Sequence, residues 1–247
     1  MEPLTPRILE PLMNSYIMKT LVIIPVLNEE KTLRGVISDV RISLPQGDIL
    51  VVNDGSTDST ADIAREEGVL ILEHPYNMGI GATMQTGFLY ALKNQYDMAV
   101  QIDGDGQHNP EFLPSLMKPI LEGRSNLVIG SRYLSPGGFK STPLRKLGIR
   151  FFTCLLCIFT RKRVTDPTSG FRAMDRKVLE LFSVNYPSDY PEVEALVSAC
   201  KKGLVFQEVP VMMKQRQGGT SSIGILSALY YMAKVTLSVA IGFFRRG

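Results

Sequence analysis

A chain of 247 residues, 45% of them hydrophobic and 21% charged, is long enough to bury the core of one large α/β domain. The formal net charge of +3 argues against a general nucleic-acid-binding protein, which is expected to be more basic. Three cysteines do not make a disulfide framework, so a reducing compartment is favoured.

Residues 1–17 contain no apolar stretch of the length that a signal peptide needs, and we expect them to form an N-terminal tail. Beyond this tail, hydrophobic periodicity predicts alternating strands and helices. The expected strands are 20–26, 49–53, 69–73, 98–102 and 127–130. The expected helices are 30–43, a segment that follows the turn at 54–58 and ends near 67, 79–95 and 111–122. This alternation predicts an α/β fold with a mostly parallel, Rossmann-like sheet and helices on both faces.

The second half is less regular. Helices are expected near 143–160, 175–183 and 191–202, followed by a strand at 205–213 and a long apolar C-terminal segment. Cys154 and Cys157 form a C-x-x-C inside the apolar run 151–159. No second pair of cysteines or histidines follows, so we expect both thiols to be buried, as small hydrophobic side chains are.

Polar clusters stand at three predicted strand ends: Asn28-Glu29, Asn53-Asp54 and Asp103-Gly104-Asp105. Ligands of such sheets bind outside the carboxyl ends of the strands, so these clusters are expected to meet. Asn53 to Asp58 also has a plainer interpretation, as an Asx turn and a helix cap. Asp58 fits the cap, whereas the carboxylate of Asp54 is placed to accept a hydrogen bond from a nucleotide base.

Asp103-Gly104-Asp105 is a D-x-D motif, with Gln107 two residues further on. Carboxylate and amide oxygens on a tight turn suit Mg²⁺ or Mn²⁺, which would bridge the donor phosphates and stabilise a diphosphate leaving group. D-x-D alone is a weak signal, and its position after a buried strand is what strengthens it. His108 has no second histidine to pair with, so we expect it to pack against this turn or to support it.

Residues 77–82, with sequence N-M-G-I-G-A, are a poor match to a dinucleotide-binding fingerprint. They follow the third predicted strand, and Met84 stands where the last glycine of that fingerprint belongs.

As a set, these motifs resemble family 2 glycosyltransferases of the GT-A fold, specifically the dolichyl-phosphate mannosyltransferase-like (polyprenyl-phosphate glycosyltransferase) branch. The matching segments are 22–29, 53–58, 77–82, 103–108, 130–133, 166–172 and 190–194. The resemblance implies a GT-A domain over 18–222, followed by an amphipathic helix over 223–247. It also implies an inverting transfer from a nucleotide diphosphate sugar to a polyprenyl phosphate.

The resemblance also implies roles for single residues. The nucleotide-sugar-binding residues are Pro25, Asn28, Glu29, Asp54, Gly79 and Asp103, and the metal ligands are Asp103, Asp105 and Gln107. The acceptor-binding residues are Arg132, Arg145, Ser169, Arg216 and Ser221; the catalytic set is Asp103 and Asp105 with the three arginines. The branch often has R-x-x-G-x-S-K, whereas this chain has Ser222 in the place of the final lysine.

Chemistry separates the candidate acceptors. A lipid phosphate is already anionic, so it needs arginine clamps rather than a general base, and the acceptor half is rich in Arg and Lys. A hydroxyl of a growing glycan needs a base, for which Glu192 and Glu194 are candidates. A third alternative is a catalytically silent nucleotide-sugar-binding subunit, against which the intact D-x-D motif counts.

Residues 223–244 are long enough to span a bilayer, but polar residues recur on one helical face. Lys234 at the centre of a span would cost about 2.5–3.5 kcal/mol. We therefore expect this helix to lie in the membrane interface, with the run 151–159 beside it, and the protein to be peripheral at the cytoplasmic face. The alternative is that these helices pack against the catalytic domain, a second copy or a membrane partner subunit.

Overall fold

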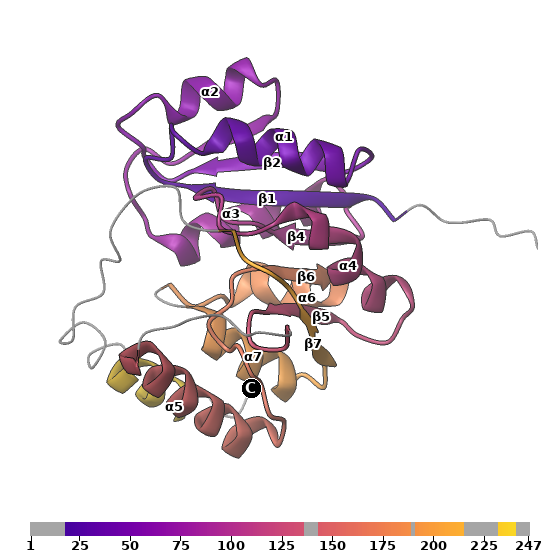
Figure 1. Ribbon diagram of the computed structural model, residues 1–247, viewed down its shortest axis with the longest axis vertical. Coiled ribbons are helices and arrows are strands. Elements are labelled where there is room, and N and C mark those ends of the chain that lie inside the picture. Colours follow the sequence, from indigo (N-terminus) through magenta and orange to yellow (C-terminus); the bar gives the residue numbers. More distant parts are fainter. Residues whose placement is uncertain (1–17, 136–142, 189–190, 215–231, 241–247) are drawn as a thin grey trace, which may run out of the picture.

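The computed structural model describes residues 18–135, 143–188, 191–214 and 232–240 (Figure 1). A seven-stranded sheet has the order β3-β2-β1-β4-β6-β5-β7. Its strands are β1 (Thr20–Val26), β2 (Asp48–Asn53), β3 (Leu70–Glu73), β4 (Met98–Gln101), β5 (Leu127–Ser131), β6 (Arg172–Asp175) and β7 (Phe206–Pro210). Neighbouring strands are parallel, except that β6 runs antiparallel to both β4 and β5.

The described helices are α1 (Leu33–Ser43), α2 (Thr60–Glu66), α3 (Ile80–Lys93), the short 3₁₀ helix η1 (Pro110–Phe112), α4 (Leu113–Leu121), α5 (Pro143–Thr160), α6 (Arg176–Val184) and α7 (Pro191–Lys201). Residues 232–240 are also helical. Residues of α1, α2 and α4 pack on one face of the sheet, and residues of α3, α5, α6, α7 and 232–240 contribute to the core on the other.

Strand residues feed both cores because side chains alternate along a strand. In β1, Leu21 and Ile23 belong to one core, whereas Val22 and Ile24 belong to the other. A strand that is buried on both faces has a continuous apolar sequence, and this is the signal from which β1 was predicted. The predicted mostly parallel sheet with helices on both faces is confirmed.

Strand β6 was not predicted. Its four residues begin with Arg172 and end with Asp175, so the sequence has neither a run of apolar residues nor a clear alternation. Ala173 pairs with Val100 of β4 on one side and with Val128 of β5 on the other. The strand therefore exists because two neighbours provide ladder partners that lie far away in the sequence.

The prediction that Cys154 and Cys157 are buried was wrong, because both are exposed. They lie on the outer face of α5, and the helical period turns Phe152, Leu155 and Leu156 towards the core instead. An apolar run of this length cannot by itself tell the inner face of a helix from its outer face.

The C-terminal segment packs on the domain over the part that is described. Val235 and Val239 are buried in the same core as α5 and α7, and the Ser238 hydroxyl donates a hydrogen bond to the Glu194 carboxylate. The inner face of residues 232–240 thus packs on the domain, while the expectation for the whole segment 223–247 stays a prediction. Within the described residues, no helix combines the length and apolar character that a membrane crossing requires.

Candidate active site

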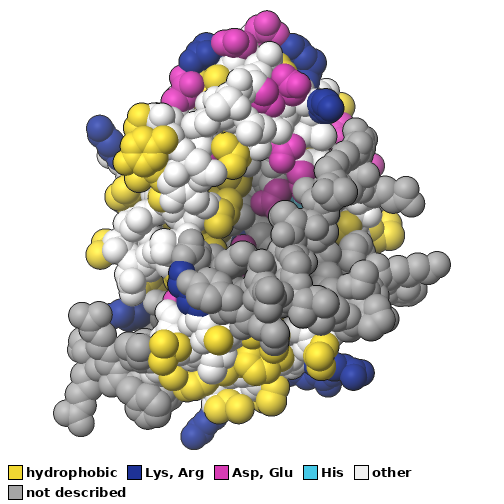
Figure 2. Space-filling model, turned by 90° about the vertical axis from the view of Figure 1, so that its left-hand side faces the viewer, with side chains coloured by type: hydrophobic (Ala, Val, Ile, Leu, Met, Phe, Trp, Pro, Cys, Tyr) yellow, Lys and Arg dark blue, Asp and Glu magenta, His cyan; other side chains and the backbone are white. Residues whose placement is uncertain are grey.

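A cleft of about 220 Å³ opens at the carboxyl ends of β1 and β4, where α/β sheets bind ligands. Its lining residues are Pro25, Glu29, Ile80, Gln101, Asp103, Gly104, Asp105 and Glu192. They come from the ends of β1 and β4, the start of α3 and the first turn of α7. Figure 2 shows acidic side chains gathered around a hollow on one face of the molecule. The predicted meeting of the first and third strand-end clusters is thus observed.

The D-x-D turn lies directly against β1. A Cβ atom on Gly104 would stand 2.7 Å from Cγ1 of Val26, so a larger residue there would clash with the Val26 side chain. The Asp103 N–H donates to Nδ1 of His108 at 2.9 Å, and the imidazole stacks on Phe171 with a ring-centroid distance of 4.9 Å. His108 therefore packs against the turn and supports it, as predicted.

Both aspartates of this turn face the cleft. The side chain of Asp103 is 40% exposed, and one carboxylate oxygen of Asp105 accepts the Gln107 N–H at 2.9 Å. Two hard oxygen donors with exposed surface suit Mg²⁺ or Mn²⁺. The described residues contain no group of three or more His, Cys, Asp or Glu side chains that could hold a metal. Gln107 is half-buried and does not line the cleft, so its role as a ligand stays a prediction.

Among the predicted nucleotide-binding residues, Pro25 and Glu29 line the cleft, whereas Asn28 supports the neighbouring turn. Asn28 has a φ of 57°, in the left-handed region that Asn tolerates better than most residues. Its Oδ1 accepts the Thr57 N–H at 2.8 Å, and its own N–H donates to the Ser56 hydroxyl at 2.9 Å. Asn28 thereby fastens the turn after β2 to the end of β1.

Asp54 lies behind the cleft and does not line it, with only 4% of the residue exposed. Its carboxylate is 2.8 Å from Nδ1 of His74 and accepts the N–H groups of Met78 and Gly79, each at 2.9 Å. Burial acts to raise the pKa of Asp54, but these hydrogen bonds outweigh it and hold the pKa below its usual value. The expected contact with a base stays a prediction; the structure shows an internal role.

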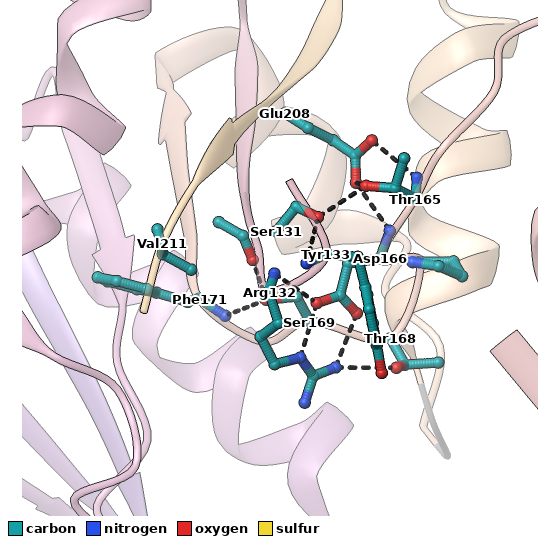
Figure 3. Close-up of polar contacts among 12 residues, drawn as sticks. Ser131, Arg132, Tyr133, Thr165, Asp166, Thr168, Ser169, Phe171, Glu208 and Val211 are labelled. Carbon is teal, nitrogen blue, oxygen red and sulfur yellow. Dashed lines mark hydrogen bonds and ion pairs between the residues drawn. The ribbon is translucent and has the colours of Figure 1, made fainter. Parts of the chain in front are cut away.

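Arg132 forms a buried ion pair in the acceptor half (Figure 3). Its Nε donates to one carboxylate oxygen of Asp166 and its Nη2 to the other, both at 2.7 Å. Burial acts to lower the pKa of Arg132, but the hydrogen bonds and charge of Asp166 raise it above its usual value. Ser169, a predicted acceptor-binding residue, is also buried, and its hydroxyl donates to the Gly130 carbonyl at 2.7 Å.

The sequence did not predict Glu208, which holds the loop that carries Asp166. Glu208 of β7 accepts the Asp166 N–H at 2.8 Å and the Thr165 N–H at 2.7 Å, so it fixes the loop that carries the aspartate (Figure 3). Burial raises the pKa of Glu208. Nothing near Asp166 in the sequence signals this contact, because β7 reaches the loop only through its pairing with β5.

The two candidate general bases, Glu192 and Glu194, lie in different surroundings. Glu192 lines the cleft, and burial raises its pKa against the opposing charge of Arg172. Glu194 instead holds Ser238 of the C-terminal helix. Arg172, also missed, is buried; it donates from Nε to the Ser169 carbonyl at 2.8 Å, and its Nη1 has no hydrogen-bond partner in the part of the chain that is described.

The remaining predicted acceptor residues lie outside what the structure describes. Arg145 is in the first turn of α5, but its side chain is outside the described part. Arg216 and Ser221 fall between 214 and 232, outside the described residues. Their roles stay predictions.

In fold, the chain resembles the crystal structure of glucosyl-3-phosphoglycerate synthase from Mycobacterium tuberculosis in complex with Mn²⁺, UDP and glucosyl-3-phosphoglycerate. The TM-score is 0.70 at 23% identity, over 92% of this chain and 80% of that chain. A complex of the same enzyme with Mg²⁺ and UDP also has a TM-score of 0.70, at 22% identity over 92% and 79% of the two chains. The fold is therefore that of the GT-A glycosyltransferases.

Residues 21–182 match the family described as Glycosyl transferase family 2, and the chain belongs to this family of glycosyltransferases. It is 34% identical to a UDP-N-acetylglucosamine–dolichyl-phosphate N-acetylglucosaminyltransferase of Methanococcus voltae, over 76% of this chain and 83% of the relative. It is 32% identical to polyprenol monophosphomannose synthase of Mycolicibacterium smegmatis, over 87% of this chain and 86% of the relative.

Proposed function

We propose that the protein transfers a sugar from a nucleotide diphosphate sugar to a polyprenyl phosphate, with inversion at the anomeric carbon. The observation that carries this proposal is the cleft itself, in which Asp103 and Asp105 meet Pro25 and Glu29 at the carboxyl edge of the sheet. The names of the relatives from Methanococcus voltae and Mycolicibacterium smegmatis support the lipid phosphate acceptor.

The diphosphate of the donor sugar nucleotide needs positive charge beside it when it leaves. Asp103, Asp105 and Gln107 would hold a Mg²⁺ or Mn²⁺ ion, which when bound neutralises charge on the leaving diphosphate. The complexes of glucosyl-3-phosphoglycerate synthase with UDP and either metal support this assignment. The chain orients the donor: Pro25 and Glu29 line the wall next to the nucleotide, and the turn of Gly104 fixes both carboxylates.

On the acceptor side, orientation and charge neutralisation matter more than proton removal, because a phosphate oxygen is already an anionic nucleophile. Arg145 and Arg216 are proposed to clamp the phosphate. Arg132 is proposed to orient the phosphate with its guanidinium, whose charge is partly offset by the ion pair with Asp166. Because Asp166 fixes the guanidinium, this charge is positioned before any substrate binds.

A second candidate function is transfer to a hydroxyl of a glycan. The observation in its favour is Glu192, a half-buried carboxyl group that lines the cleft and has a raised pKa, as a general base requires. The Glu192→Gln variant separates the two reactions. It is expected to retain most activity if the nucleophile is a phosphate, and to lose about 100-fold or more if a hydroxyl must be deprotonated.

We propose further that the protein lies peripherally at the cytoplasmic face of a membrane, with the outer face of α5 and of residues 232–240 against the lipid. Exposed apolar side chains there are Leu147, Ile158 and Leu237, and the basic residues Arg150, Arg161, Lys162 and Arg163 are exposed next to them. Figure 2 shows hydrophobic side chains gathered at the lower end of the molecule with Lys and Arg at the margins. This pattern suits an interface with anionic headgroups.

The decisive experiment incubates the purified protein and Mn²⁺ or Mg²⁺ with a panel of UDP- and GDP-sugars and a short-chain polyprenyl phosphate. A lipid-linked monosaccharide that mild acid releases is the expected product. Sugar transfer to an oligosaccharide, with none to the lipid phosphate, would favour the hydroxyl acceptor instead. Absence of transfer and of donor hydrolysis with every sugar would favour the silent binding subunit.

A further inference from the structure

We propose that His74 is a positioning residue for the nucleotide donor, acting through Asp54 on the glycine segment, residues 77–82. This inference rests on the proposed function. The imidazole bridges two elements: Nδ1 lies 2.8 Å from Oδ1 of Asp54, and Nε2 lies 2.9 Å from the hydroxyl oxygen of Thr86 in α3. An ionised carboxylate only accepts hydrogen bonds, so Nδ1 carries a proton in the contact with Asp54, and Nε2 and the Thr86 hydroxyl share the second hydrogen bond.

The second step runs from Asp54 to the cleft. The carboxylate that holds His74 also accepts the N–H groups of Met78 and Gly79, immediately before α3 begins. Gly79 has a φ of 90°, a left-handed conformation that glycine adopts without strain. The next residue, Ile80, lines the donor cleft. The position of this wall therefore depends on a carboxylate that His74 orients.

The glycine segment is also held from its other side. The Gly81 N–H donates to the Ser188 carbonyl at 3.1 Å, and a Cβ atom on Gly81 would stand 2.1 Å from the Pro187 carbonyl oxygen. Shortly after Ser188 the chain enters α7, whose Glu192 lines the same cleft. The segment is thus wedged between Asp54 and the loop before α7, so a shift of Asp54 is transmitted to two walls of the cleft.

The surroundings of His74 favour its two hydrogen bonds and confine their effect to the glycine segment. The His74 side chain is 10% exposed, so water competes little for its hydrogen bonds. Neither His74 nor Asp54 belongs to the two apolar cores. Loss of the imidazole is therefore expected to displace the glycine segment while the sheet and its cores stay folded.

Two substitutions at His74 dissect the relay. In His74→Asn the side-chain amide replaces Nδ1 and keeps the contact with Asp54; in His74→Gln it replaces Nε2 and keeps only the contact with Thr86. The probes are UDP and GDP with Mn²⁺, titrated by calorimetry. We expect His74→Gln to weaken binding of the preferred nucleotide about tenfold, and His74→Asn by less than about threefold. Hydrogen–deuterium exchange at the Met78 and Gly79 amides should rise in His74→Gln.

Gln85→Ala is the matched control, because it removes a side-chain hydrogen bond of α3 that reaches Ser183 rather than the glycine segment. It should change neither nucleotide affinity nor exchange at Met78 and Gly79. If His74→Gln does not fold, Thr86→Val tests the same relay, with an expected loss of about two- to threefold.

The outcomes are distinguishable. Wild-type protein that binds neither nucleotide overturns the proposed function, and this inference with it. Wild-type binding that His74→Gln leaves unchanged overturns the inference alone. Equal losses in His74→Asn and His74→Gln overturn the route through Asp54.

Discussion

At the residue scale, the same side-chain type has different roles in different surroundings. Asp103 and Asp105 face the cleft, whereas Asp54 and Asp166 are buried and hold donors of the protein itself. Asp54, Asp103 and Asp105 follow strands and Asp166 lies in the loop before β6, so the residue type alone does not separate the aspartates that face the cleft from those that are buried behind it.

Asp105→Ala is expected to lower turnover by about 100-fold or more, because it removes an oxygen donor from the proposed metal site, which would neutralise charge on the leaving diphosphate. Turnover with a lipid phosphate acceptor checks the loss, and an unchanged melting temperature shows that the fold is intact. Near wild-type turnover of this variant in the presence of EDTA would contradict the metal assignment.

Asp166→Ala is expected to destabilise the fold by about 3–5 kcal/mol, because it leaves the guanidinium of Arg132 buried without its carboxylate partner. Urea denaturation measures the change. Asp62→Ala is the matched control, since it breaks the exposed ion pair with Arg65 and should cost less than about 1 kcal/mol. Equal losses in the two variants would show that burial of the Arg132 pair has no energetic consequence.

At the element scale, the position of α3 depends on a glycine that permits close approach. Gly81→Ala is expected to destabilise the protein by about 1–3 kcal/mol, because its Cβ atom would meet the Pro187 carbonyl. Gly35→Ala is the control, since no atom lies within 4 Å of its added Cβ and alanine favours the helix α1. We expect it to be neutral or slightly stabilising. Thermal denaturation of both variants measures the change in stability. A Gly81→Ala protein as stable as wild type would contradict the close packing of Gly81 against the Pro187 carbonyl.

At the scale of the whole molecule, the active-site cleft and the apolar end with its basic margins are separate features of the surface. Ile158→Asp with Leu237→Asp is expected to reduce co-flotation with vesicles that contain anionic lipid by about tenfold or more, since two apolar contacts are lost and negative charge is added. Ile42→Asp, an equally exposed change on α1, should have no effect. Binding that is insensitive to the first pair of changes would favour a protein partner or a second copy at this face.

The amino-acid sequence by itself determined the layered architecture and the D-x-D turn. Local periodicity carries the strands that are buried on both faces, and the topology of alternating strands and helices brings their carboxyl ends to one edge. The helices at 143–160 and 191–202 were also predicted close to their observed ends, because their apolar positions recur at the helical period.

Only the tertiary structure decided which polar residues face the cleft and which are buried behind it. Strand β6, the Arg132–Asp166–Glu208 network and the His74–Asp54 relay all join residues that lie 20 or more positions apart, so no local pattern encodes them. The exposed cysteines of α5 show the same limit. An apolar run specifies a helix that will pack, but the neighbours that it meets in three dimensions decide which face is inside.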